Sequence, residues 1–432
     1  MGGNGSVLLY TTIGELIKKY RGQASLSITQ LANVAGIHKT VISKIENGDT
    51  RRPEWKTLKA IAGVLKIPPH QIVEHYVELE QRPDALLELL LEAIELADMR
   101  VVSRVALTFL ESPREETYTL LERLYHFAGT VTNAEVKLTL YHLIVKYSRE
   151  RGVPPYIAKG LLQAYLIERL DLKRLEESFR MGEEIIHYVD FLTQEEQILF
   201  YYRMALHAHN TKKYQQCIQF CKAGLALETA YTELTARAYL AMINSYYFLE
   251  NFDAVERHLD VFETFDYGFV PDAAKTTRGI VKAKKKDFDA AIPILRNCLD
   301  EGSRDIKIHA ANELMEVFFQ TGEMDSIAEL LKREEEILPT NLQTPYKHVS
   351  IGRYYQQKAK FQTSIGLVDE GMKSYAISLQ AYGTVNALEE IMTCLNDILS
   401  FFSKSINLQY VEMIQKVYNE IVSKCKKQEV LG

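Results

Sequence analysis

"GIHKTVISKIENG", residues 36–48, is the stretch that decides how the N-terminal part of this chain folds. Isoleucine and valine side chains recur on one side at helical spacing, and small polar and basic side chains occupy the other side. Gly36 permits a tight turn before this segment, and Gly48 ends it. The stretch therefore predicts a short helix, residues 38–47, with an apolar side turned to a core and a polar side turned outward.

Four more short helices are predicted around this one, between residues 11 and 76. The segments "TIGE" at 12–15 and "SITQ" at 27–30 both fit the capping box. In this motif the first residue caps the start of a helix and the fourth reaches back to it. Apolar residues then recur at helical spacing after each cap. The sequence therefore predicts a small N-terminal domain of five helices at residues 1–78.

Charge is distributed unevenly along the 432 residues. Residues 1–83 hold 11 Lys and Arg against 7 Asp and Glu, a balance of +4, whereas the whole chain carries −6. The remainder therefore carries −10. A basic N-terminal part on an acidic body indicates an anionic partner for the first part only. With 47% apolar residues, the chain is long enough to bury the cores of two or more domains.

Several classes of protein are not favoured by the sequence. No apolar run reaches the length of about eighteen residues typical of a membrane span, and no basic leader precedes the short apolar run near the N-terminus. The five cysteines stand at irregular spacings, and no zinc-type pair accompanies Cys217 and Cys221. No nucleophile, metal or phosphate-loop motif occurs. We expect a cytoplasmic protein that is not an enzyme, has no catalytic residues, metal or cofactor, and does not contact a membrane.

The segment from Ser27 to Arg52 resembles the Xre/Cro-type helix-turn-helix of phage repressors. The matching residues are Leu31 and Ala32, Gly36, Ile42 and Ser43, "IENG" at 45–48 and "RRP" at 51–53. Ile28 departs from the family pattern, which usually has Gln there. One contact at the start of the second helix is therefore expected to be missing.

The resemblance implies that the third helix lies in the major groove of double-stranded DNA. Lys39, Thr40 and Lys44 would then read bases, because Lys donates to guanine and Thr contacts base edges or a thymine methyl. The other expected contacts are His38 and Ser43, together with Asn47, Arg51 and Arg52, which would hold phosphates. The alternative is a solvated helix face in a domain that has lost DNA binding, and for His38 alone a surface role explains its position equally well.

Residues 84–404 carry a second pattern, a row of amphipathic helices with short polar breaks and almost no strand-like alternation. Five similar segments, among them "NTKKYQQCI" and "KKKDFDAAI", contain one apolar marker each. The markers are Tyr214, Phe252, Phe288, Met324 and Phe361, separated by 38, 36, 36 and 37 residues. Such a unit cannot bury its apolar stripe alone and must stack on its neighbours. The repeats therefore predict an α-solenoid with a concave inner surface, and the whole chain is expected to be all-α.

The turns of these segments resemble those of the tetratricopeptide repeat, whose inner surface is lined at about 15, 12, 8 and 5 residues before the marker. Carboxamides on this surface suit an extended peptide, and Arg suits a carboxylate. The same count places His309 and Tyr346 there. These side chains would otherwise be ordinary solvated residues of a scaffold repeat. The candidates for peptide binding are Tyr202, His209, Arg237, Asn244, Tyr247, Asn312, Glu316, Arg353 and Gln356.

The expected organisation is a helix-turn-helix domain at 1–78, a linker at 79–83, repeats at 84–404 and a capping or dimerisation helix within 405–432. This order resembles the peptide-sensing regulators of Gram-positive bacteria called the RRNPP family. The resemblance implies a quorum-sensing homodimer that binds a two-fold related operator and a short imported signalling peptide, which switches DNA binding. Two alternatives stay open: repeats that bind a response-regulator protein, as inhibitor or phosphatase, and a scaffold with a vestigial DNA-binding domain.

Overall fold

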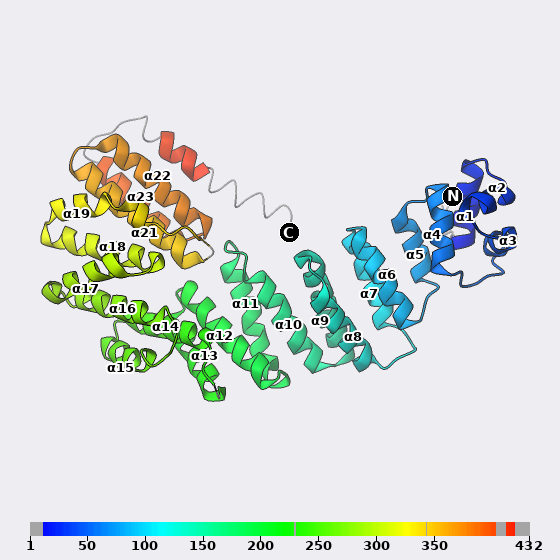
Figure 1. Ribbon diagram of the computed structural model, residues 1–432, viewed down its shortest axis with the longest axis horizontal. Helices are drawn as coiled ribbons and strands as arrows, with labels where there is room; N and C mark the ends of the chain where they lie inside the picture. Colours follow the sequence, from blue (N-terminus) through cyan, green and yellow to red (C-terminus); the bar gives the residue numbers. More distant parts are fainter. Residues whose placement is uncertain (1–11, 229, 343, 403–411, 420–432) are drawn as a thin grey trace, which may run out of the picture. The chain divides into compact units, whose positions relative to one another are not determined.

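The computed structural model describes residues 12–228, 230–342, 344–402 and 412–419. These residues form helices joined by short turns and contain no strand, which confirms the all-α fold class (Figure 1). The chain divides into two compact units. The first comprises the residues up to Ile167 together with Glu184–Leu192, and the second comprises Glu168–Glu183 and the residues from Thr193 onward. No helix within the described ranges is long and apolar enough to cross a membrane.

The first unit starts with the five expected helices and continues with five longer ones. An apolar core runs through all of them, from Ile13 in the first helix to Ala164 in the last. The short helices are α1 (Ile13–Gln23), α2 (Ile28–Ala35), α3 (Lys39–Glu46), α4 (Trp55–Leu65) and α5 (Pro69–Val77). The others are α6 (Pro83–Glu95), α7 (Met99–Leu110), α8 (Thr117–Thr130), α9 (Ala134–Arg151), α10 (Pro154–Glu168) and the 3-10 helix η1 (Ile186–Phe191).

Local sequence explains where the first three helices begin and end. Both capping boxes are present, with Thr12 capping α1 and Ser27 capping α2. Gly36 ends α2 with a φ of 67°, a left-handed conformation that favours glycine. His38 caps α3, because its Nδ1 accepts the backbone N–H of Thr40 at 3.4 Å. The predicted helix 38–47 is therefore observed as Lys39–Glu46 with its two capping residues.

Of residues 79–83, expected as a linker, the first four form a hydrogen-bonded connection between α5 and α6, and Pro83 is the first residue of α6. The buried carboxylate of Glu80 accepts the backbone N–H groups of Gln81 and Arg82 at 3.0 and 2.9 Å. It also pairs with the Arg82 guanidinium at 2.8 Å, which lowers the pKa of Glu80 to about 2. The chain thus continues from the five short helices into α6 through ordered structure, and the two units meet in sequence further on, after Ile167.

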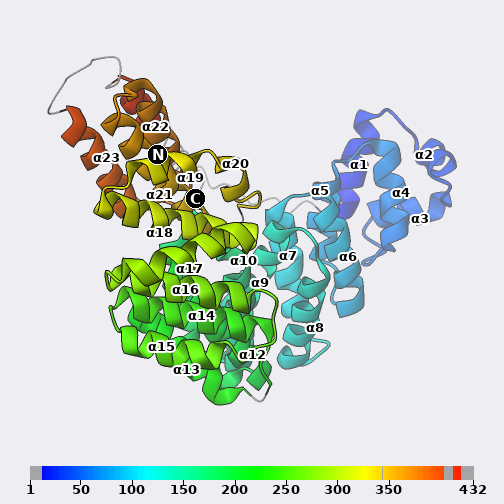
Figure 2. The same cartoon turned by 60° about the vertical axis from the view of Figure 1, so that its left-hand side comes forward.

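The second unit is a stack of helix pairs. The first helices of successive pairs, α12, α14, α16, α18 and α21, contact one another in that order, and each also packs on its own partner helix. In Figure 2, α14, α16 and α18 lie side by side. The helices are α11 (Leu175–Ile185), α12 (Gln194–Asn210), α13 (Tyr214–Leu227), α14 (Glu233–Phe248), α15 (Phe252–Phe262), α16 (Val270–Lys284), α17 (Phe288–Glu301), α18 (Arg304–Thr321), α19 (Met324–Leu331), α20 (Glu334–Ile337), α21 (Pro345–Ser364), α22 (Val368–Thr384) and α23 (Leu388–Phe402).

Four of the five repeat markers coincide with helix starts. Tyr214, Phe252, Phe288 and Met324 are the first residues of α13, α15, α17 and α19. The fifth marker differs, because Phe361 lies in the last turn of α21 and the next helix begins at Val368. α21 is longer than its counterparts, at 20 residues, and Gly366 lies in the turn after it with a φ of 87°.

Most of the segment 405–432, expected as a capping or dimerisation helix, lies outside the described residues. Its described part, residues 412–419, is helical. Val417 is buried there in an apolar cluster with residues of α22 and α23, among them Met372 and Ile391. This part of the chain therefore extends the stack by covering its last pair of helices.

Candidate functional site

The third helix is held against the first by a buried ion pair. Arg21 in α1 donates from Nε and Nη2 to the two carboxylate oxygens of Glu46, at 2.7 Å each, and from Nη1 to the carbonyl of Leu26 at 2.9 Å. Glu46 is only 8% exposed, at the end of α3. The two helices approach closely at Gly14, where a Cβ would lie 2.3 Å from the carbonyl oxygen of Ile45. Both features fix the position of α3 relative to α1.

The residues predicted to contact DNA lie on the outer side of α3 and in the loop after it. Ile42 and Ile45 turn to the core. Arg52 donates to the side chain of Gln81 at 3.1 Å, which draws it toward the turn between α5 and α6. Ser43 is half-buried. The exposed residues of the set are His38, Lys39, Thr40, Lys44, Asn47, Arg51 and Arg52.

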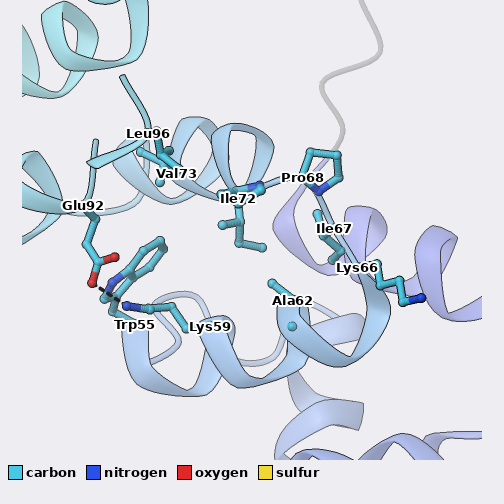
Figure 3. A pocket seen from close by; sticks show the side chains of 12 residues that line it. Trp55, Lys59, Ala62, Lys66, Ile67, Pro68, Ile72, Val73, Glu92 and Leu96 are labelled. Carbon is cyan, nitrogen blue, oxygen red and sulfur yellow. Dashed lines mark hydrogen bonds and ion pairs between the residues drawn. The ribbon is translucent and has the colours of Figure 1, made fainter. Parts of the chain in front are cut away.

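The first unit also contains an apolar cavity of about 460 Å³ between α4, α5 and α6 (Figure 3). Trp55 forms one wall and packs on Tyr76, with ring centroids 5.1 Å apart. Lys59 and Glu92 form an ion pair of 2.5 Å beside it. The described lining of this cavity includes none of the residues predicted to contact DNA.

A second cavity, in the second unit, brings together five of the nine residues predicted to bind a peptide. Its volume is about 580 Å³, within the range of pockets that bind small ligands. The first helices of the stacked pairs supply most of the lining, and α13, α22, α23 and adjoining turns supply the rest. The five residues are His209 from α12, Asn244 and Tyr247 from α14, Asn312 from α18 and Arg353 from α21.

The other four predicted residues are not part of this lining, and two of them, Tyr202 and Arg237, interact elsewhere in the second unit. The phenol of Tyr202 is buried and donates to Glu228. Arg237 pairs with Glu233 at 2.6 Å and lies over the ring of Phe269, 4.6 Å from its centroid. The four residues are Tyr202, Arg237, Glu316 and Gln356.

Gln356 and Glu316 are engaged within the helix stack. Gln356 is buried, donates to Asp397 at 2.5 Å and accepts from the hydroxyl of Tyr382 at 2.9 Å. Glu316 is exposed and accepts from the Gln357 amide at 3.3 Å. Both side chains therefore tie neighbouring helices together.

Two neutral histidines stand in the wall of the cavity. Burial lowers the pKa of His209 and of His309 to about 4, so both rings are uncharged at neutral pH. The Nδ1 atoms lie 3.1 and 3.3 Å from the hydroxyls of Ser245 and Ser350, respectively. The ring of Tyr346 lies between them, with its centroid 4.7 Å from that of His309 and 6.3 Å from that of His209. This wall offers flat, uncharged rings to a ligand.

Asn312 lines the cavity and keeps one side-chain acceptor without a partner among the described residues. The residue is only 2% exposed, and its Nδ2 donates to the main-chain carbonyl of Ser350 at 2.9 Å. Its Oδ1 has no hydrogen-bond partner among the described residues. A buried acceptor left without a donor costs free energy, so this oxygen is suited to an N–H group brought by a ligand.

Arg353 is already paired inside the cavity. Its Nη1 lies 2.5 Å from an oxygen of Glu313. Burial disfavours the charged guanidinium, but the neighbouring carboxylate outweighs this, and the pKa of Arg353 is raised. A ligand carboxylate could therefore reach Arg353 only by competing with Glu313.

Six charged residues of the lining were not predicted from the sequence: Lys212, Glu250, Lys284, Glu313, Glu389 and Glu390. Three of them form one group, with Lys212 just after α12 and Glu389 and Glu390 at the start of α23. The Nζ of Lys212 lies 2.5 Å from Glu389 and 2.7 Å from Glu390. Lys212 and Glu389 are 177 residues apart, and neither stands at a counted position before a marker, so no periodicity could have linked them.

Comparison with known proteins identifies the first part of the chain. Residues 17–72 match the helix-turn-helix family. The chain is 33% identical over 75 residues to the uncharacterized HTH-type transcriptional regulator RghRB of Bacillus subtilis (strain 168), which covers 17% of this chain and 54% of that protein. It is 32% identical over 68 residues to the HTH-type transcriptional regulator SinR of the same organism, which covers 16% and 61%. The chain thus spans about half to three-fifths of these relatives.

Two solved structures are similar over most of the chain. Bacillus thuringiensis PlcR, in complex with the peptide PapR7 and DNA, is 14% identical with a TM-score of 0.27, covering 88% of this chain and 96% of that one. A Rap protein complexed with competence and sporulation factor is 10% identical with a TM-score of 0.35, covering 90% and 98%. At these TM-scores neither likeness indicates what this chain binds. The chain therefore carries an Xre-type helix-turn-helix domain at residues 17–72, followed by a body of stacked helices.

Proposed function

We propose that the protein is a cytoplasmic transcription regulator that binds operator DNA through α3 and a short peptide in the cavity of the second unit. The observation that supports the peptide most directly is Asn312, a buried residue whose Oδ1 lacks a donor among the described residues. An extended peptide carries a backbone N–H at nearly every residue and can supply that donor. Asn244 lines the same cavity and offers a second carboxamide.

The DNA-binding part follows from the exposed side of α3. Lys39, Thr40 and Lys44 reach outward from a helix whose other side is buried, as a helix in the major groove requires. Arg51 lies exposed in the loop that follows and would hold a phosphate. A single small domain binds weakly, so a homodimer that reads two half-sites, one or more helical turns apart, is part of the proposal.

Peptide binding would regulate DNA binding through the shape of the helix stack. The cavity is lined by helices from several successive pairs, so a ligand that bridges them favours one arrangement of the stack. A tenfold change in DNA affinity needs a coupling free energy of about 1.4 kcal/mol, and DNA must then change peptide affinity by the same factor.

The first test selects DNA from a randomised duplex library with the full-length protein. The proposal requires a recovered sequence with two-fold symmetry that binds more tightly than random duplex at the same salt concentration. Equal affinity for both duplexes would remove DNA recognition from the proposal. Selection of displayed short peptides, followed by calorimetry, then tests the cavity, and a peptide that binds without any change in operator affinity would contradict the coupling.

The dimer is tested by removing residues 405–432. Light scattering should then report reduced self-association, and operator affinity should fall with it because the two half-sites are no longer bound as a unit. A truncated protein that stays dimeric would exclude this segment as the dimerisation element.

A further inference from the structure

The charged residues that line the second-unit cavity do not balance. Three cations face four carboxylates, and each cation is already paired. Arg353 pairs with Glu313 at 2.5 Å, and Lys284 pairs with Glu250 at 3.7 Å. The third cation is shared between two acids. The described lining therefore has one more carboxylate than cations. Every cation in it is already paired with a carboxylate of the same lining.

The excess lies at the shared lysine. The Nζ of Lys212 contacts Glu389 at 2.5 Å and Glu390 at 2.7 Å. One ammonium cannot neutralise two carboxylates, so a net negative charge is left at this corner. The side chain of Glu390 is 20% exposed, that of Lys212 is 43% exposed and that of Glu389 is 77% exposed. The Glu390 carboxylate is thus partly shielded from water, whereas the Glu389 carboxylate lies open to it, so a ligand can reach this corner.

Aromatic rings stand beside this corner. Tyr214 and Phe248 stack with centroids 4.7 Å apart and an interplanar angle of 10°, and both line the cavity with Glu390. Burial raises the pKa of Tyr214, and Glu390 and Glu389 raise it further, which places their charges close to this ring. The negative face of an aromatic ring attracts a cation, as a carboxylate does. Rings and excess acid therefore favour the same kind of ligand group.

An independent observation points in the same direction. The side chain of Asn312 has an acceptor oxygen, Oδ1, that receives no hydrogen bond from the described residues. The residue is only 2% exposed. The lining residues therefore leave acceptors unmatched at two places: the neutral Oδ1 of Asn312, and the carboxylates of Glu389 and Glu390 that share one lysine. A matching ligand brings N–H groups and a positive charge.

We propose that Glu389 and Glu390 form a cation subsite that takes a positively charged group of the ligand in place of Lys212. This rests on the proposed function, in which the ligand is a short peptide. The charged group is then either the free amino terminus or the side chain of a Lys or Arg residue. Binding exchanges one ammonium for another between the same carboxylates, so Lys212 acts as an internal competitor that the ligand must displace.

The experiment uses the full-length protein and random short peptides displayed with free amino termini. A peptide recovered from the selection is synthesised in three forms: unmodified, acetylated at its amino terminus, and with any Lys replaced by norleucine or any Arg by citrulline. Calorimetry should show a loss on the order of tenfold or more for one of the two modified forms, because a hydrogen bond to a charged group is lost. That form identifies the source of the positive charge.

Variants of the protein separate this subsite from a general effect on folding. Glu390→Gln should weaken binding of the unmodified peptide by about the same factor and leave binding of the neutral form unchanged. Lys212→Met should strengthen binding of the unmodified peptide, which a damaged fold would not do. Glu176→Gln is the matched control, because Glu176 pairs with the adjacent Lys213 at 2.7 Å and is not part of the cavity lining.

Two results would overturn the inference, and they are distinguishable. If peptides are recovered but neither modification, Glu390→Gln nor Lys212→Met changes their affinity, the cation subsite is wrong and peptide binding stands. If no peptide is recovered, the proposed function fails and the subsite fails with it.

Discussion

Arg21 and Glu46, 25 residues apart in the chain, form a two-bond ion pair that holds α3 against α1. Neither residue points outward toward a DNA partner, and Glu46 is almost fully buried. The proposed base-reading helix is thus fixed on its buried side by an ion pair. The two parallel hydrogen bonds of this pair restrict the orientation of α3 more than apolar packing alone would. The pKa of Arg21 is raised by its hydrogen bonds to Glu46.

Breaking this pair should therefore destabilise the first unit. Arg21→Ala leaves the Glu46 carboxylate buried without its partner, at an expected cost of roughly 3 kcal/mol. Chemical denaturation followed by the fluorescence of Trp55, the only tryptophan, would measure it. Arg104→Ala is the control, since Arg104 pairs with Glu78 at an exposed site and should cost less than about 1 kcal/mol. Equal losses of unfolding free energy in the two variants would show that the buried pair stabilises the unit no more than the exposed one.

The exposed side of α3 should separate sequence reading from general attraction to DNA. Lys39→Ala and Lys44→Ala should each cost about 1–3 kcal/mol on the selected operator and relax specificity at one position. Arg51→Ala should weaken binding to all duplexes and flatten the salt dependence. Arg52→Ala should have a smaller effect, because Arg52 already bonds to Gln81. Binding measured by fluorescence anisotropy at several salt concentrations decides this, and uniform losses for all four variants would argue against base reading.

The helix-turn-helix part was predictable because its signals are local. Capping boxes, apolar spacing and two glycines lie within a few residues of the structure they specify, and all five helices were found. The Arg21–Glu46 pair was not predicted, since nothing in the spacing of two charged residues on different helices indicates that they meet. Likewise, the close approach at Gly14 depends on the neighbouring helix rather than on its own segment.

In the repeats, the last marker is out of register with the other four. The helix after α21 begins at Val368, seven residues after Phe361, whereas each of the other markers is itself the first residue of a helix. Seven residues are nearly two turns of an α-helix, so this offset returns to almost the same face. Of the residues counted back from Phe361, Tyr346 and Arg353 line the cavity, whereas Gln356 is buried between helices.

The second unit should lose stability on acidification already below about pH 6.5, where histidines of the unfolded chain become protonated. Titration of carboxylates alone would destabilise it only at lower pH. Burial lowers the pKa of His207, His209 and His309 to about 4, whereas an unperturbed histidine titrates at about 6.5. Between these values the unfolded chain binds protons that the folded chain does not. The free energy of unfolding should therefore fall as pH drops from about 6.5 toward 4, with no contribution above that window.

Denaturation at a series of pH values would measure this loss. His209→Gln and His309→Gln should each flatten the dependence between pH 6.5 and 5, because one of the titrating groups is removed. His70→Gln is the control, since His70 is exposed in the first unit. A pH dependence that is the same in all three variants would mean that the two cavity histidines are not held neutral by burial.

The last prediction concerns the carboxamides in the cavity. If Asn312 accepts a backbone N–H of a bound peptide, Asn312→Ala should weaken peptide binding by about 1–3 kcal/mol, because that N–H is left buried without an acceptor. Asn244→Ala should have an effect of the same sign, and the two losses should add if each carboxamide meets a different peptide unit. Operator affinity without peptide should stay unchanged in both variants, since neither residue belongs to the first unit. Asn396→Ala serves as the matched control, because Asn396 is exposed on α23 and is not part of the cavity lining. Calorimetry with a peptide recovered by selection gives the comparison, and normal peptide binding by both cavity variants would place the peptide elsewhere on the protein.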